Sequence, residues 1–227
     1  MPGCAPSSPR GVRAERARQA KHMPVYSLGG LVPVVDPTAF VHPQAVLIGD
    51  VIVGAHCYVG PGASLRADFG RVILSAGSNV QDCCVLHCFP SRDTLLEQDA
   101  HIGHGAVLHG CTVRRGALIG IGAIIMDDAV VEEEAFVGAA SLVPAGFVVP
   151  RRTLVTGVPA RVVRTLTPEE LAWKATGTRE YQELAARCLA TLKECQPLAA
   201  PEAGRPSMGG SSAVPLHSIG RPKDVRR

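Results

Sequence analysis

Residues 113–155 read VRRGALIGIGAIIMDDAVVEEEAFVGAASLVPAGFVVPRRTLV, and this stretch decides the fold. An aliphatic side chain returns at every sixth position, at Val113, Ile119, Ile125, Val131, Val137, Val143, Val149 and Val155. A period of six matches neither the 3.6-residue period of an α-helix nor the alternation of a single half-buried strand. It is typical of a coil of three short strands joined by turns, with one inward aliphatic side chain on each strand. The repeat therefore predicts a left-handed parallel β-helix.

The same interval continues toward the N-terminus. Its aliphatic positions are Val41, Leu47, Val53, Val59 and Leu65, then Val80 and Leu86, then Ile102 and Leu108. Frequent glycines, β-branched residues and prolines in this region exclude an α-helical interpretation. We expect coils from about residue 33, within an all-β domain of residues 23–160.

A helical pattern follows in residues 161–196. Thr167-Pro168-Glu169-Glu170 is a capping box with proline at the first helical position. We predict a first helix to about Thr176, a break at Gly177, and a second helix from about Thr178 to Cys195. One apolar stripe of the second helix should pack on the β-helix. The stripe consists of Tyr181, Leu184, Ala185, Cys188, Leu189 and Leu192.

The two ends of the chain are predicted to be disordered. Residues 1–22 are interpreted as an extension upstream of a natural start at Met23. Residues 197–227 are rich in proline, glycine and serine, a composition that does not bury enough apolar surface to fold.

Composition narrows the classes of function. The net charge is +3, and much of the positive excess lies in the two ends, without interleaved aromatic residues, which argues against nucleic-acid binding. No apolar run approaches the ~18 residues that span a bilayer, so we expect no membrane partner. The eight cysteines show no C-x-x-C spacing, and no signal-peptide pattern precedes them. A cytoplasmic protein with reduced thiols is the simplest interpretation.

The repeat also assigns histidines to faces of the coils. Leu86 and Leu108 are 22 residues apart, one 18-residue coil plus an insertion of four. Each residue after an inward aliphatic points outward, so Arg66, His87 and His109 form a ladder with rungs about 4.8 Å apart. At this spacing, slightly convergent rings of His87 and His109 reach the separation of two zinc ligands.

His104 falls on the neighbouring face and points away from this ladder. A homotrimer would bring it to the ladder of the adjacent chain. We therefore predict a zinc site, or a site for another divalent metal, formed by His87, His104 and His109. Three protein ligands leave a fourth position for water, which is typical of catalytic zinc sites.

Two other interpretations of nearby residues stay open. A mixed cysteine and histidine site would use some of Cys83, Cys84, Cys88 and Cys111, although these cysteines are better explained as small fillers of the core. His101 precedes the inward Ile102 and is interpreted as a surface residue or an outer partner of the metal site.

Several motifs resemble the γ-class carbonic anhydrase family. They are Arg66-Ala67-Asp68, Asn79-Val80-Gln81-Asp82 with the following His87, and His104-Gly105-Ala106-Val107-Leu108-His109-Gly110-Cys111. The resemblance covers roughly residues 33–160. It implies a zinc, iron or cobalt site at each trimer interface, with His87 and His109 from one subunit and His104 from the next.

A narrower resemblance spans residues 23–196. Met23-Pro24-Val25-Tyr26, Leu171-Ala172-Trp173-Lys174 and Gly177-Thr178-Arg179-Glu180-Tyr181-Gln182 resemble the phenylacetic acid degradation branch of this family, to which the carnitine operon proteins are close relatives. This resemblance implies thioesterase activity on coenzyme A thioesters derived from aromatic rings.

The sequence departs from active γ-class anhydrases at two places. Acidic residues that serve water positioning or proton transfer in that family are replaced here by Phe69 and by Cys88-Phe89-Pro90. Rapid CO₂ hydration needs proton export, so we favour thioester hydrolysis. Phe69 and Phe89 are then candidates for an apolar wall beside an aromatic acyl group.

The expected catalytic residues are Gln81, Arg66, Asp68 and Asp82. Gln81 would orient the nucleophile, the two aspartates would hold their neighbours, and Arg66 would pair with one of them across the subunit boundary. A purely structural role in locking the trimer is the alternative for Arg66 and its partner. Candidates for contacts with coenzyme A phosphates are Arg114, Arg115, Arg151 and Arg152.

Three other functions remain open. The first is a γ-class carbonic anhydrase. The second is a coenzyme A-dependent acyltransferase, which would use a histidine base without a metal. The third is a non-catalytic scaffold whose trimer is locked by the metal.

Overall fold

The computed structural model describes residues 24–208 and 215–219. The predicted extension of residues 1–22, with the start proposed at Met23, lies outside the described residues. In the described part of the predicted tail, residues 197–208 contain no helix or strand, and a short 3-10 helix, η1, spans Leu216–Ser218. Disorder of the tail stays a prediction.

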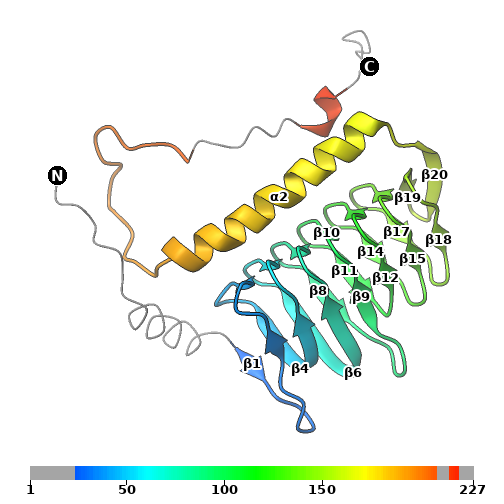
Figure 1. The fold of residues 1–227 in the computed structure, drawn as a ribbon, viewed down its shortest axis with the longest axis horizontal. Coiled ribbons are helices and arrows are strands. Elements are labelled where there is room, and N and C mark those ends of the chain that lie inside the picture. Colours follow the sequence, from blue (N-terminus) through cyan, green and yellow to red (C-terminus); the bar gives the residue numbers. More distant parts are fainter. Residues whose placement is uncertain (1–23, 209–214, 220–227) are drawn as a thin grey trace.

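The chain winds into a left-handed parallel β-helix, as the six-residue repeat predicts (Figure 1). Strands pair in parallel with the equivalent strands of the neighbouring coils, so β8 pairs with β11 and β11 with β14. The strands are β1 (Val25–Tyr26), β2 (Val34–Val35), β3 (Phe40–Val41), β4 (Val46–Val53), β5 (Tyr58–Val59), β6 (Ser64–Leu74), β7 (Asn79–Val80), β8 (Val85–His87), β9 (Thr94–Leu96), β10 (His101–Ile102), β11 (Val107–His109), β12 (Thr112–Val113), β13 (Leu118–Ile119), β14 (Ile124–Ile125), β15 (Val130–Val131), β16 (Phe136–Val137), β17 (Leu142–Val143), β18 (Val148–Val149), β19 (Thr153–Gly157) and β20 (Ala160–Thr165).

The predicted inward positions form the core. Leu86, Leu108, Ile125 and Val143 lie at the same place on successive coils, and none has exposed surface. The parallel register stacks like on like, so each aliphatic side chain contacts the equivalent one above and below. This stacking buries a continuous apolar column that no single coil could form.

Strand β6 is longer than the others and turns a corner of the coil. It pairs with β8 through its first half and with β9 through its second half. Residues 66–70 therefore lie at the corner itself, beside the segment that joins β8 to β9. Gly70 permits this close approach, since a Cβ there would lie 2.0 Å from the carbonyl oxygen of Arg92. The corner places Asp68 next to His87.

One continuous helix, α2 (Pro168–Thr191), follows the coils, so the predicted break at Gly177 is wrong. The capping box at Thr167 and Glu170 is present as predicted. A glycine within a helix costs only about 1 kcal/mol relative to alanine. Packing of Tyr181, Leu184 and Ala185 on the coils, just after Gly177, offsets that cost.

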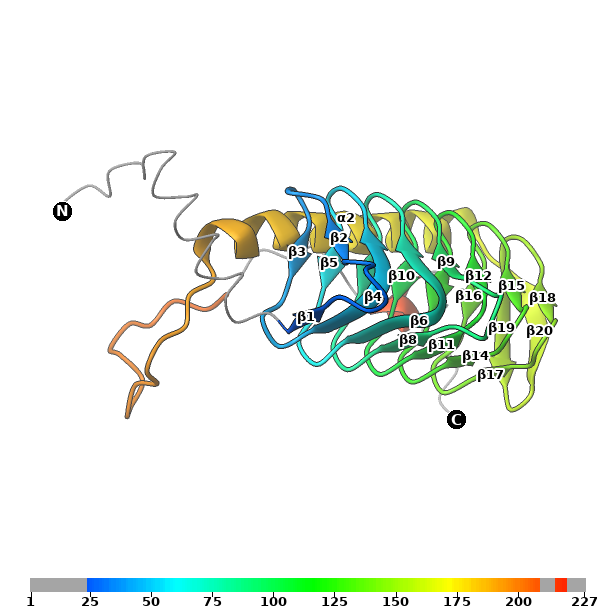
Figure 2. The ribbon, with the colours of Figure 1, turned by 90° about the horizontal axis from the view of Figure 1, so that it is seen from below.

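The helix covers one flank of the β-helix, as Figure 2 shows from below. Five of the six residues of the predicted apolar stripe pack with Phe40 and Tyr58, namely Tyr181, Leu184, Ala185, Cys188 and Leu189. The sixth, Leu192, is the C-cap and is 37% exposed, so the helix ends before the predicted Cys195. The rings of Tyr58 and Tyr181 lie 5.3 Å apart. No helix among the described residues is long and apolar enough to cross a membrane.

An antiparallel hairpin closes the C-terminal end of the coils. Strand β20 pairs with β19 and extends the β-structure to Thr165, beyond the boundary predicted at residue 160. The pairing covers an edge of β19 that would otherwise expose unpaired backbone groups.

Gly177→Ala should stabilise the protein by about 0.5–1 kcal/mol, because alanine loses less backbone entropy in a helix than glycine. Open space surrounds the position, so the added methyl group meets nothing. Thermal unfolding followed by circular dichroism should show a melting temperature raised by about 1–3 °C.

Gly146→Ala is the matched control, since Gly146 is equally open but has a φ of +69°. That substitution should lower the melting temperature, because alanine is strained in the left-handed region. A Gly177→Ala variant that is no more stable than the parent would contradict the single continuous helix.

Candidate metal centre

His87 and His109 lie on adjacent rungs, as the coil count predicts. They end strands β8 and β11 and are direct partners in the parallel register. Their ring centroids are 5.0 Å apart, and His87 Nδ1 lies 3.0 Å from His109 Nε2. Strand pairing therefore brings two imidazole nitrogens close together without any contribution from a distant part of the chain.

A carboxylate holds the other nitrogen of each ring. His87 Nε2 lies 2.8 Å from Asp68 Oδ1, and His109 Nδ1 lies 2.6 Å from Asp127 Oδ1. A carboxylate accepts hydrogen bonds, so these two ring nitrogens carry the protons. In neutral rings, the lone pairs of His87 Nδ1 and His109 Nε2 then face each other across the 3.0 Å gap.

Two facing lone pairs repel unless a cation lies between them. Two nitrogens bound tetrahedrally to zinc are about 3.4 Å apart, for Zn–N bonds of about 2.0–2.1 Å. Moving the two rings slightly apart would bring their nitrogens to that distance. Carboxylates on the outer nitrogens are also the usual outer partners of metal-bound histidines. The donor set therefore fits a divalent metal such as zinc.

Asp127 was not identified from the sequence. It follows β14, one coil beyond His109, and Leu108 pairs with Ile125 in the register. In that register Met126 stands opposite His109, and Asp127 is one position further along in the turn, so the coil count alone does not point to it. Gly110 makes the contact possible, because a Cβ at this position would lie 2.5 Å from Asp127 Oδ1.

His104 belongs to a different corner of the coil, after β10. Its Nδ1 lies 3.2 Å from Asp82 Oδ2, and its side chain is 44% exposed. Gly60 leaves room for Asp82, since a Cβ there would meet the carboxylate at 2.4 Å. His104 thus has the same pattern as His87 and His109, with a carboxylate on one ring nitrogen.

One chain does not assemble the predicted three-histidine site. Among the described residues, no three His, Cys, Asp or Glu side chains gather as a metal site. The structure brings His87 and His109 together and leaves His104 at another corner, as the face assignment predicts. A ligand set from two chains therefore stays a prediction.

Arg66 pairs with Asp68 within its own chain. The two residues are two apart on β6, so their side chains point to the same side of the strand. Arg66 and Asp68 thus pair within one chain, and a pair of Arg66 with Asp82 across a subunit boundary stays a prediction. Partial burial acts to raise the pKa of Asp68, but hydrogen bonds from His87 and Arg66 outweigh it, and the pKa is lowered.

Gln81 and His101 lie under helix α2. Gln81 is 3% exposed, and its Nε2 lies 3.1 Å from Asn79 Oδ1 and 2.7 Å from His101 Nε2. The His101 ring also contacts Tyr181, with ring centroids 5.3 Å apart. His101 is therefore enclosed under α2 and is not an open surface residue, while a role as an outer partner of the metal site stays a prediction. Burial, with smaller effects of Lys174 and His104, lowers its pKa to about 3, so the ring is neutral.

The cysteines near the histidines do not form a mixed metal site. Cys84, Cys88 and Cys111 point inward and are buried, as expected for fillers of the core. Burial raises the pKa of Cys84 to about 11 and that of Cys111 to about 12, which disfavours the thiolate form that binds metal. Cys83 is exposed on a turn.

Two aromatic side chains flank the histidine pair. The ring centroid of Phe69 lies 5.7 Å from that of His87, and Phe89 lies 6.5 Å from His109. Phe69 is 57% and Phe89 58% exposed, so packing within one chain does not account for them. The rim of the site is apolar at the positions where acids would serve an anhydrase.

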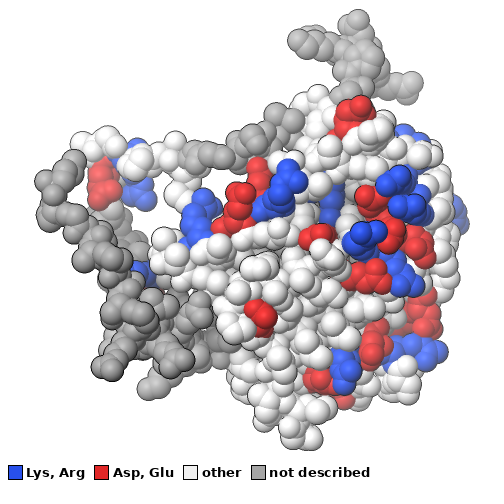
Figure 3. Space-filling view, viewed as in Figure 1, with Lys and Arg blue, Asp and Glu red and all other residues white. Residues whose placement is uncertain are grey.

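The four arginines predicted to contact coenzyme A phosphates lie on the later coils, where Figure 3 shows acidic and basic side chains interspersed. Arg114 pairs with Glu97. The other three, Arg115, Arg151 and Arg152, pair with Glu133 or Glu134.

No family model matches this chain, but known proteins are similar to it in sequence over most of its length. The carnitine operon protein CaiE of Escherichia coli O157:H7 is 54% identical over 192 residues, which make up 85% of this chain and 98% of that protein. Among solved structures, a proposed acetyltransferase from Bacillus cereus is 35% identical, with a TM-score of 0.74. It covers 74% of this chain and 98% of its own. A hexapeptide transferase family protein from Anaplasma phagocytophilum is 34% identical, has a TM-score of 0.70, and covers 73% and 97%.

Asp127→Ala should weaken zinc binding about 10- to 100-fold, because His109 loses the carboxylate that fixes its tautomer and orientation. Competition titration against a chromophoric chelator measures the affinity. Asp128→Asn is the control, since Asp128 is adjacent but pairs with Arg92 instead, and asparagine tolerates its φ of +56°. Equal zinc affinity in the two variants would refute the assignment of Asp127.

Proposed function

The chain belongs to the hexapeptide-repeat family of the carnitine operon protein CaiE, and we propose that it is a metal-dependent hydrolase that cleaves acyl-coenzyme A thioesters. One observation carries the metal dependence. His87 Nδ1 and His109 Nε2 face each other at 3.0 Å, and aspartates hold the opposite nitrogens of both rings. In neutral rings, this arrangement leaves neither of the two facing nitrogens protonated, so both can bind a metal.

A homotrimer completes the ligand set. Strands β8, β11 and β14 form an outward face between the corner of His87 and His109 and the corner of His104. This face carries Val85, Val107 and Ile124, which are 41%, 36% and 38% exposed. Their exposure on one sheet face supports an interface with a second copy of the chain. Each copy presents His87 and His109 at one edge of this face and His104 at the other, so a closed threefold ring would make three equivalent sites.

The chemistry divides between the metal and the side chains. When bound, zinc supplies Lewis acidity and lowers the pKa of a coordinated water toward ~7. Asp68 and Asp127 hold the His87 and His109 rings in the tautomers that leave one nitrogen of each free. Arg66 orients Asp68 through their ion pair. Asp82 fixes His104. Gln81 is 3% exposed and its amide nitrogen is held by Asn79 and His101, so it is left out of the groups that would orient the nucleophile.

The apolar rim supports a thioester substrate with an apolar acyl group. Exposed Phe69 and Phe89 offer ring faces beside the histidine pair. They stand where proton-transfer acids are expected in an anhydrase, which favours hydrolysis of a thioester over rapid CO₂ hydration. The resemblance to the phenylacetic acid degradation protein PaaY narrows the proposed substrates to coenzyme A thioesters derived from aromatic rings.

An acyltransferase is the second candidate, because the Bacillus cereus protein that is 35% identical is a proposed acetyltransferase. An acyltransferase of this kind would use a histidine base and transfer the acyl group to an amine or sugar. The histidines of the pair, however, are held by aspartates with their free nitrogens facing each other, a geometry that suits a metal better than a single base.

Metal analysis combined with a phenylacetyl-coenzyme A hydrolysis assay tests the proposal. Protein purified without chelator should contain about one metal ion per chain, as expected for one complete ligand set per subunit. Hydrolysis should be lost on chelation and restored by zinc. Retention of full hydrolysis after the metal is removed, or transfer of the acyl group to an added amine in place of hydrolysis, would overturn it.

His104→Ala should lose the metal and the hydrolysis while the circular dichroism spectrum of the β-helix is retained. The side chain is about half exposed, so its removal leaves no core cavity. His56→Asn serves as the control, since His56 is exposed, lies outside the site, and has a positive φ that asparagine tolerates. Wild-type metal content in His104→Ala would remove this residue from the site.

A further inference from the structure

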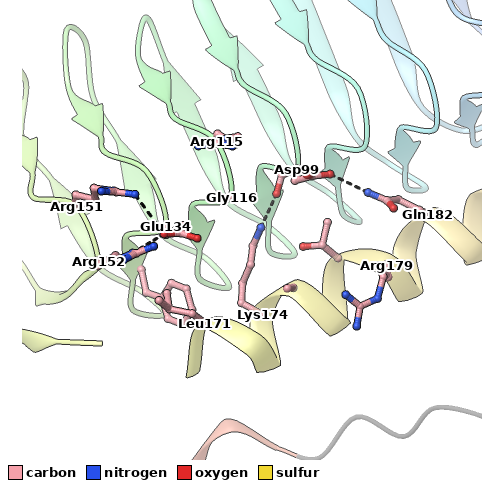
Figure 4. Close-up of a pocket in the computed structure, with 13 residues that line it drawn as sticks. Asp99, Arg115, Gly116, Glu134, Arg151, Arg152, Leu171, Lys174, Arg179 and Gln182 are labelled. Atoms are coloured by element: carbon pink, nitrogen blue, oxygen red, sulfur yellow. Dashed lines mark hydrogen bonds and ion pairs between the residues drawn. The ribbon is translucent and has the colours of Figure 1, made fainter. Parts of the chain in front are cut away.

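A pocket of about 350 Å³ lies between helix α2 and a third corner of the coils (Figure 4). The coil side is formed by turns that carry Asp99, Gly116 and Glu134. The helix side is one face of α2, with residues three or four positions apart: Leu171, Lys174, Ala175, Thr178, Arg179 and Gln182. The volume is in the range of small-molecule sites.

Lys174 brings a buried positive charge to this pocket. Its side chain is 5% exposed, and its Nζ donates to the carbonyl oxygen of Asp99 at 2.5 Å. The Asp99 carboxylate turns instead to Gln182, whose Nε2 lies 2.9 Å from Oδ1. A buried ammonium with one neutral acceptor is costly, and the nearby carboxylates of Asp99 and Glu134 compensate this cost only in part. Burial lowers its pKa to about 8, so it remains mainly protonated at pH 7.

Thr178 supplies an independent observation. It is 3% exposed, and its Oγ1 is a buried side-chain atom with no hydrogen-bond partner among the described residues. Thr178 lies one helical turn after Lys174 and lines the same pocket. A buried hydroxyl without a partner costs about 1–3 kcal/mol. A ligand oxygen in the pocket would relieve this cost.

The remaining charges around the pocket also favour an anion. Arg179 has a hydrogen bond to Thr176 and no ion pair among the described residues. On the opposite wall, Arg151 and Arg152 pair with Glu134 (Figure 4). Arg115 and Arg151 also pair with Glu133, which does not line the pocket. The pocket is thus lined by five cations and two carboxylates, and Glu133 behind the arginines brings the carboxylates to three. The cations are Arg115, Arg151, Arg152, Lys174 and Arg179, and the lining carboxylates are Asp99 and Glu134. A dianion matches this excess better than a monoanion does.

We propose that this pocket binds phosphate, as the free ion or as the phosphate group of a small organic molecule. Lys174 and Arg179 would neutralise its charge, and the Thr178 hydroxyl would donate to one of its oxygens. Charge-assisted hydrogen bonds of this kind are the usual means of phosphate recognition. The turns that form the pocket follow β9 and β12, whereas His87 and His109 lie at the corner before those strands. The pocket and the metal centre are therefore at different corners of the coils.

Isothermal titration at a fixed ionic strength of about 0.15 M, with inorganic phosphate and with coenzyme A, tests the proposal. Arg179→Gln should weaken phosphate binding at least about fivefold, and Thr178→Val about threefold, because each removes one donor. Thr178→Val preserves the side-chain shape and removes a hydroxyl that has no partner, so folding should be retained.

Arg187→Gln is the matched control. Arg187 is exposed on the same helix and does not line the pocket, so the same loss of charge should change binding less than about twofold. Tighter binding of coenzyme A than of inorganic phosphate, lost in Arg179→Gln, would support an organic phosphate. Similar affinities, also lost in Arg179→Gln, would support the free ion. Binding of neither probe, or binding that the two pocket variants leave unchanged, would overturn the proposal.

Discussion

The register between successive coils is the constraint on which the rest of the structure depends. Parallel pairing sets Leu86 under Leu108, and the same register sets His87 under His109. One strand alignment therefore sets both the inward aliphatic column and the outward histidine pair. A slip by one residue would point both histidines into the core and both leucines into water. The burial of the leucines thus enforces the position of the imidazoles.

Carboxylates convert this proximity into a specific arrangement of ring nitrogens. Asp68 reaches His87 because β6 turns the corner beside it, and Asp127 reaches His109 because Gly110 has no side chain. These aspartates fix the protons on the outer nitrogens, which leaves the inner nitrogens to face each other. The proposed metal centre follows from this pattern, and the separate corner of His104 makes a neighbouring chain part of it.

Much of this was predictable from the sequence, because a six-residue period fixes which side chain points inward and hence which points out. The same count placed His87, His109 and His104 on their faces. It did not identify Asp127, since the five-residue step between Leu108 and Val113 shifts the next coil by one position. The break predicted at Gly177 was wrong because packing of α2 on the coils outweighs the low helix propensity of glycine. In the pocket under α2, Lys174 contacts Asp99, which lies 75 residues earlier in the chain. No local sequence pattern predicts such a contact.

If two chains share each metal site, mixed trimers of two variants should regain metal that neither variant binds alone. His104→Ala and His109→Ala chains with different affinity tags are co-expressed, and assemblies that carry both tags are isolated. In a closed ring of three, every mixed trimer contains one interface with all three histidines. Almost no metal is expected in either variant alone, and about one third of the wild-type content is expected in the mixed trimers. Mixed trimers as empty as the separate variants, or a single variant that keeps its metal, would contradict it.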